Sequence, residues 1–260
     1  MARRVGSRPE RAPDVAEPEV AQFATADELA EEVASRLVAR LADLQSAGTV
    51  PSIVLTGGGI AERIHKAVAA VDTDDVDWSR IDVWFGDERF VPEDDPDRNA
   101  GQAAAALLDR RPFDPVRVHV MPSSDGKYGD DVDAAAAGYA DELREAAVEG
   151  DVPRFDVLML GIGPDGHCAS LFPGRPEIDD ERTVVPVRES PKPPPTRISL
   201  TRGPLCNASE VWWLASGSEK AEAVSRAVHG ADPHEVPAAA PTGFDKTIWF
   251  LDDAAASRLG

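Results

Sequence analysis

The chain has 260 residues, of which 42% are hydrophobic and 28% are charged, a composition typical of a soluble globular protein. Its formal net charge of −20 argues against a nucleic-acid-binding protein, because affinity for a phosphate backbone comes from clustered lysines and arginines. No apolar run approaches the roughly 20 residues that span a bilayer, so we expect a cytoplasmic protein without a membrane partner.

The first 18 residues are rich in proline, arginine and glutamate and predict a disordered leader. No apolar segment follows the paired arginines near the start, so a secretory signal is not expected. Residues 19–260 are predicted to form a single α/β domain. The two cysteines, Cys168 and Cys206, form no CxxC pair and predict neither a disulfide framework nor a structural metal site.

Helical and strand-like hydrophobic patterns alternate along the rest of the chain. In chain order they predict a helix at 26–48, a strand at 52–56, a helix at 59–71, a strand at 81–86, a helix at 99–109, a strand at 116–122, a helix at 131–150, strands at 155–163, 197–201 and 210–217, a helix at 218–230 and a strand at 247–253. This alternation is typical of a mostly parallel sheet with helices on both faces. In such sheets, ligands bind beyond the carboxyl ends of the strands.

Three glycines, Gly57, Gly58 and Gly59, join the predicted strand at 52–56 to the next helix. Glycines let backbone N–H groups approach a ligand closely, and a helix N-terminus attracts anions. The sequence is neither GxGxxG nor a Walker motif, so a tight turn at a helix start is an equally good interpretation.

The charged residues Asp87, Glu88 and Arg89 directly follow the predicted strand at 81–86. Most charge runs are solvated loops, but this one is expected on the same rim of the sheet as the glycines. A carboxylate beside an arginine is suited to orient a sugar hydroxyl, a carbonyl or a phosphate.

The stretch LMLGIGPDGHCASLFPG, residues 158–174, ends an apolar strand in glycines that surround Asp165 and His167. An imidazole with its ordinary pKa of about 6.5 can accept a proton from water near neutral pH, and Asp165 can orient it or bind a hydroxyl. No further metal ligands lie at metal-site spacings, and Cys168 is interpreted as a packed side chain. Structural roles are predicted for His65, His119, His229 and His234.

A basic segment lies between residues 184 and 205, where four cations face the single acid Glu189. The cations are Arg188, Lys192, Arg197 and Arg202. The prolines of PKPPP restrict this loop and lower the entropic cost of holding Lys192 on a ligand. A proline-stiffened surface turn is the alternative, but a phosphate ligand needs such a basic segment on so acidic a chain.

Together, GDERFVP, GIGPDGHCASLFPG and PKPPPTRISLT resemble the 6-phosphogluconolactonase family, within the larger group of glucosamine-6-phosphate deaminases and ribose-5-phosphate isomerases. The resemblance runs from about residue 20 to residue 251 and implies a Rossmann-like α/β fold without a metal or an organic cofactor. The deaminases continue their GxGxDGH core into a segment with a glutamate that serves ring opening. Here the continuation is ASLFPG, which favours the lactonase.

The resemblance implies hydrolysis of a phosphorylated sugar lactone, with His167 as general base, Asp165 aligning it and Arg89 facing the developing negative charge. The expected phosphate and substrate ligands are Gly57, Gly58, Gly59, Asp87, Lys192 and Arg197. A monomer is expected, with a homodimer as the alternative. Two other functions remain open: a sugar-phosphate isomerase or deaminase of the same fold, and a non-enzymatic sugar-phosphate sensor.

Overall fold

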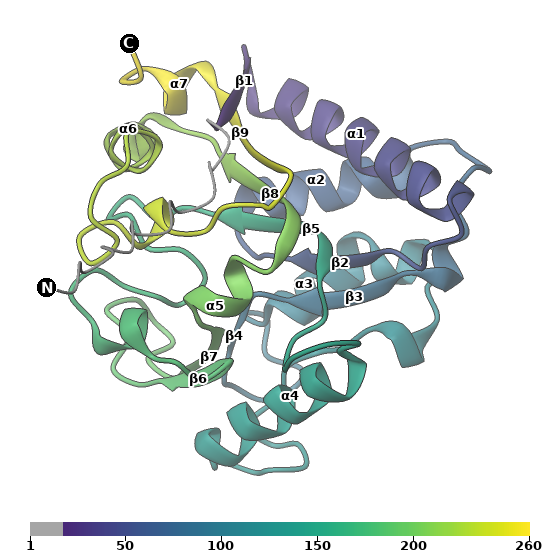
Figure 1. The fold of residues 1–260 in the computed structure, drawn as a ribbon, viewed down its shortest axis with the longest axis vertical. Helices are drawn as coiled ribbons and strands as arrows, with labels where there is room; N and C mark the ends of the chain where they lie inside the picture. Colours follow the sequence, from purple (N-terminus) through teal and green to yellow (C-terminus); the bar gives the residue numbers. More distant parts are fainter. Residues whose placement is uncertain (1–17) are drawn as a thin grey trace, which may run out of the picture.

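The computed structural model describes residues 18–260, so the predicted leader lies outside the described residues except for Pro18. Six parallel strands form a central sheet in the order β1-β9-β8-β5-β2-β3 (Figure 1). Their bounds are Glu19–Phe23 for β1, Ser52–Leu55 for β2, Asp82–Phe85 for β3, Phe155–Gly161 for β5, Ala208–Ala215 for β8 and Lys246–Asp252 for β9. The predicted parallel sheet is confirmed.

Helices cover both faces of this sheet. Every residue of β8 is buried, including Trp212 and Trp213, which are successive residues and therefore face opposite sides. Figure 1 shows α1 and α2 on one side of the sheet and α4 on the other. The helices are α1 (Ala26–Ser46), α2 (Gly59–Ala70), α3 (Asn99–Ala106), α4 (Val132–Ala146), α5 (Arg202–Leu205), α6 (Ala221–Val228) and α7 (Asp253–Ala256). The fold is the predicted single α/β domain.

Helix α1 forms where the sequence supplies both a cap and an apolar stripe. The Thr25 hydroxyl accepts a hydrogen bond from the Glu28 amide at 3.1 Å, and the Glu28 carboxylate accepts one from the Ala24 amide. Leu29, Val33, Leu37 and Leu41 then recur at helical spacing and are buried. The cap and the stripe together fix where this helix begins and which face it buries.

A second, antiparallel sheet of three short strands was not predicted. It has the order β4-β7-β6, with β4 at Asp87–Arg89, β7 at Arg197–Leu200 and β6 at Val184–Val187. The charged segment after β3 is therefore a strand, whose Arg89 is the register partner of Arg197 on β7. This small sheet joins two segments that lie about 100 residues apart in the sequence and that both carry candidate site residues.

The predicted strand at residues 116–122 is wrong. Asp114 caps a 3-10 helix at Pro115–Arg117, and beyond it only Val118 forms a bridge to Val83 of β3. Val116 is 80% exposed, so the alternating apolar residues of this segment do not mark a buried strand. Proline at the first position of the 3-10 turn overrides the β-propensity of the valines.

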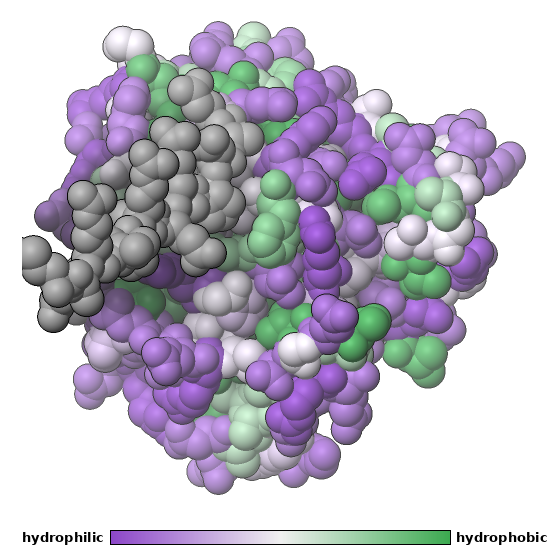
Figure 2. Space-filling model, in the orientation of Figure 1, coloured by the Kyte–Doolittle hydropathy of each residue, from purple (hydrophilic) through white to green (hydrophobic). Residues whose placement is uncertain are grey.

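Polar residues predominate among the described residues on the face that Figure 2 shows. No helix among residues 18–260 combines the length and the apolar character needed to cross a bilayer.

At the β3 edge of the sheet, His119 stacks on Trp84 and its Nδ1 lies 2.7 Å from the Glu142 carboxylate. Its Nε2 lies 4.0 Å from the Asp82 carboxylate. Burial lowers the pKa of His119, but the two carboxylates raise it by more, to about 9. The predicted structural role of this histidine fits these contacts.

Because the folded pKa of His119 lies above the ordinary value of about 6.5, its charge stabilises the fold fully below that pH, and the contribution is lost as the pH rises through about 9. We predict that His119→Gln lowers the free energy of unfolding more at about pH 6 than at about pH 10. Chemical denaturation at both pH values measures the difference. Equal losses at the two pH values would contradict this.

Candidate active site

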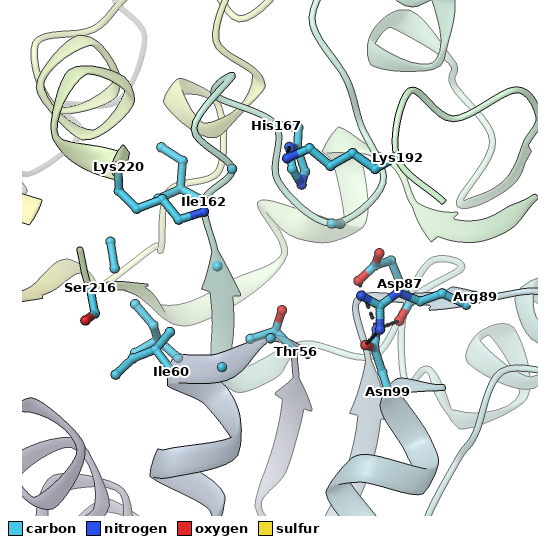
Figure 3. Close-up of a pocket in the computed structure, with 18 of the residues that line it drawn as sticks. Thr56, Ile60, Asp87, Arg89, Asn99, Ile162, His167, Lys192, Ser216 and Lys220 are labelled. Carbon is cyan, nitrogen blue, oxygen red and sulfur yellow. Dashed lines mark hydrogen bonds between the residues drawn. The ribbon is translucent and has the colours of Figure 1, made fainter. Parts of the chain in front are cut away.

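The site lies where the order of the central sheet reverses. The chain passes from β2 to β3 in one direction and later returns to place β5 on the other side of β2. The loops after β2 and β5 therefore separate at their carboxyl ends, which is the usual ligand position in such sheets. A cavity of about 530 Å³ opens there, a size suited to a small metabolite (Figure 3).

The glycine loop forms one wall of this cavity. Gly57, Gly58 and Gly59 all line it. A Cβ on Gly57 would lie 1.9 Å from Oδ1 of Asn99, so a larger residue there would have to displace Asn99, and Gly58 has a φ of 102°. The 12-residue helix α2 starts at Gly59, which directs its N-terminal amides toward the cavity and makes an anion site possible.

The β4 residues form the wall on the other side of the cavity, where Figure 3 shows Asp87, Arg89 and Asn99 together. The Arg89 Nη1 donates to Oδ1 of Asn99 at 2.5 Å and to the Asp97 carbonyl at 2.7 Å. Glu88 points away from the cavity and is fully buried, where its carboxylate accepts hydrogen bonds from the amides of Asn99 and Ala100. Glu88 thus fixes the start of α3 against β4.

His167 and Asp165 meet in the tight turn after β5. His167 Nδ1 lies 2.5 Å from Asp165 Oδ1, so the carboxylate selects the tautomer with the proton on Nδ1. The imidazole packs against Phe172 at 4.7 Å between ring centroids, and Nε2 has no hydrogen-bond partner among residues 18–260. A Cβ on Gly163 would lie 1.9 Å from Nδ1, which explains why glycine is needed there.

Lys192 lies beside this pair. Its Nζ is 3.3 Å from Asp165 Oδ1 and 3.3 Å from His167 Nδ1. Burial raises the pKa of Asp165, but the hydrogen bond from His167 and the charges of His167 and Lys192 outweigh it and hold that pKa well below its ordinary value. Asp165 is therefore an anion that binds an imidazole N–H and an ammonium at once.

Arg197 is largely occupied within the protein. Its Nε donates to the Pro194 carbonyl, and its Nη2 donates to the carbonyls of Lys192 and Pro193. Its Nη1 is 3.9 Å from Asp87 Oδ2. These contacts hold the loop that carries Lys192 and leave only Nη1 for a ligand.

The cavity also contains residues that the sequence interpretation missed: Arg63, Asn99, Ser216, Glu219 and Lys220. Lys220 follows β8, so the rule about strand ends was sufficient to find it. Burial and the nearby Lys192 ammonium lower the pKa of Lys220. No sequence pattern pointed to Asn99, because its position depends on how the start of α3 packs against β4.

Cationic side chains predominate in the lining of the cavity. Five lining residues are cationic, namely Arg63, Arg89, Lys192, Arg197 and Lys220, and two are acidic, namely Asp87 and Glu219. The chain as a whole has a formal charge of −20. A locally basic cavity on so acidic a protein selects for an anionic ligand.

Cys168 is buried and burial raises the pKa of its thiol, which fits its predicted packing role.

Several known proteins are similar to this chain over most of its length. Residues 24–249 match the family described as glucosamine-6-phosphate isomerases/6-phosphogluconolactonase. The chain is 52% identical to the 6-phosphogluconolactonase of Streptomyces coelicolor over 236 residues, which cover 89% of this chain and 90% of that protein. It is 44% identical to the 6-phosphogluconolactonase of Mycobacterium tuberculosis, covering 91% of this chain and 96% of that protein. The crystal structure of 6-phosphogluconolactonase from Thermotoga maritima has a TM-score of 0.78 at 25% identity, covering 90% of this chain and 99% of that chain.

The glycine loop gives a matched pair of variants. We predict that Gly57→Ala lowers the free energy of unfolding by about 1–3 kcal/mol, because the new methyl group must displace Asn99. Gly59→Ala meets no atom within 4 Å and lies at the start of α2, so it is expected to be neutral or stabilising. Denaturant titration of both variants measures this. Equal stability of the two would show that Gly57 is not constrained by Asn99.

Proposed function

Because the chain belongs to the family of glucosamine-6-phosphate isomerases and 6-phosphogluconolactonases, we propose that it hydrolyses 6-phospho-D-glucono-1,5-lactone to 6-phospho-D-gluconate, the second step of the oxidative pentose phosphate pathway. The observation that carries the proposal is the contact of Asp165 with both His167 and Lys192 at the edge of a basic cavity. It supplies a base and a cation to one reacting centre.

His167 is the proposed general base. With its Nδ1 proton held by Asp165, the free Nε2 takes a proton from water, and the water oxygen attacks the lactone carbonyl carbon. The bond from that carbon to the ring oxygen then breaks. The imidazolium returns its proton to the departing ring oxygen, which gives the open-chain carboxylic acid. This acid releases the second proton of the water to solvent and becomes the carboxylate product.

Lys192 is proposed to act at the reacting end of the substrate. The sequence expectation placed it on the phosphate, but its ammonium lies 3.3 Å from His167 Nδ1. The carbonyl carbon and the phosphate lie at opposite ends of the hexose, so a cation beside the proposed base is closer to the carbonyl than to the phosphate. An ammonium at this position stabilises the oxyanion that forms when water attacks. Arg89, on the opposite wall of the cavity, is proposed to stabilise the same oxyanion or to bind a ring hydroxyl.

The phosphate is proposed to occupy the N-terminus of α2 with Lys220. Figure 3 shows Lys220 and Ser216 on the Ile60 side of the cavity, across from Asp87 and Arg89. The amides that follow Gly58 favour an anion, and a phosphate dianion would compensate the charge of Lys220, whose pKa is lowered by burial. Arg197 is proposed to act on the phosphate or the sugar only through Nη1.

The chain is further proposed to act as a monomer in the cytoplasm, with a homodimer as the alternative. A deaminase of the same fold remains the competing activity. Release of ammonia from glucosamine 6-phosphate by the purified protein would favour it, whereas lactone hydrolysis without ammonia release supports the proposal.

The role of His167 gives the first kinetic prediction. His167→Ala should lower kcat by about 10²- to 10⁴-fold with little change in KM, because general-base help is lost while binding remains. The assay is pH-stat titration of freshly generated lactone, corrected for spontaneous opening. His229→Ala, an exposed histidine at the end of α6, is the control and should keep the wild-type rate. A wild-type kcat in His167→Ala would refute the assignment of the base.

The two lysines should separate kinetically. Lys220→Ala should chiefly raise KM, by about 10- to 100-fold for one lost charge-assisted hydrogen bond, whereas Lys192→Ala should chiefly lower kcat. Lys246→Ala, an exposed lysine on β9, is the control. The reverse pattern, with Lys192→Ala raising only KM, would indicate that Lys192 binds the phosphate, as the sequence suggested.

A further inference from the structure

A strained turn directly follows His167. Ala169 has a φ of 47°, in the left-handed region that residues with a Cβ rarely occupy. The Leu171 amide closes the turn by donating to the Cys168 carbonyl at 2.9 Å. Such strain persists only where the surrounding structure holds the backbone, and it is concentrated at functional sites. Some contact must therefore hold this turn.

Ser170 supplies that contact. It is fully buried, and its hydroxyl donates to Asp87 Oδ2 at 2.7 Å. Its backbone amide donates to the Ser199 hydroxyl at 3.1 Å. One residue of the turn is thus fixed at two points.

Both anchors belong to the small antiparallel sheet. Asp87 of β4 and Ser199 of β7 are register partners, so the two side chains that hold Ser170 come from directly opposed positions on neighbouring strands. Ser199 is itself held, because its hydroxyl donates to the Leu200 carbonyl at 2.9 Å. The remaining carboxylate oxygen of Asp87 lies 3.4 Å from Nδ2 of Asn99. The anchor is therefore rigid, and the carboxylate of Asp87 is engaged within the protein.

We propose that Ser170 is a positioning residue for His167: by binding Asp87 and Ser199, it holds the strained turn at Ala169 and keeps the imidazole against Asp165 and Lys192. The inference rests on the proposed role of His167 as the base. It assigns Asp87 to the support of the turn, whereas the sequence suggested a contact with the substrate.

The test is Ser170→Ala, which removes the hydroxyl and leaves the backbone amide in place. We expect kcat to fall by about 10- to 100-fold with little change in KM, as for a catalytic group that is slightly misplaced. The second readout is the pair of ¹⁵N chemical shifts of the His167 ring, which distinguish a protonated from an unprotonated nitrogen. The wild type should show the proton on Nδ1, and Ser170→Ala should shift toward a mixture of tautomers.

Ser209→Ala is the matched control. Ser209 is also a buried serine whose hydroxyl is hydrogen-bonded to a charged side chain, here accepting from Arg154 at 3.2 Å, but it lies at the amino end of β8, outside the turn that carries His167. It should keep both the wild-type kcat and the wild-type ring shifts.

An unchanged kcat or unchanged ring shifts in Ser170→Ala would overturn the proposal, as would equal losses in Ser209→Ala. The ring shifts report where the imidazole lies whether or not His167 is the base. If His167→Ala were fully active, the proposed base would fail, and the shifts would still test the positioning by Ser170.

Discussion

The active site depends on one carboxylate that binds two partners. Asp165 Oδ1 accepts the imidazole N–H of His167 and lies within hydrogen-bond distance of the Lys192 ammonium. The first contact leaves Nε2 free to accept a proton, and the second holds the Lys192 ammonium 3.3 Å from the other ring nitrogen, Nδ1. Without this anion, the ammonium and the imidazole would lie in contact with no opposite charge between them. Only a glycine at position 163 leaves room for the arrangement.

The fold brings these groups together from distant parts of the chain. The parallel sheet places the ends of β2, β5 and β8 next to one another, which supplies the glycine loop, the histidine turn and Lys220. The antiparallel sheet adds what the parallel sheet does not. Through the pairing of β4 with β7, it sets Arg89 opposite the glycine loop and brings the Lys192 loop over the histidine turn. Each sheet thus delivers one part of the chemistry.

The sequence predicted those features that depend on local pattern. The alternation of strands and helices, the position of His167 beyond an apolar strand and the glycine loop follow from periodicity and residue type. Lys192 was predicted as a ligand but not beside His167, because that contact depends on how a proline-rich loop folds across the site. Asn99 and the Ser170 anchor were missed for the same reason, since both depend on a three-residue strand too short to be recognised. The strand predicted at 116–122 was wrong because Pro115 starts a 3-10 turn.

The most direct test of this account is a crystal structure with the product, 6-phospho-D-gluconate, bound. We expect the phosphate at the N-terminus of α2 within reach of Lys220, and the new carboxylate beside His167 Nε2 and the Lys192 ammonium. A product bound in the opposite direction, with its phosphate on Lys192 and its carboxylate on the glycine loop, would contradict it.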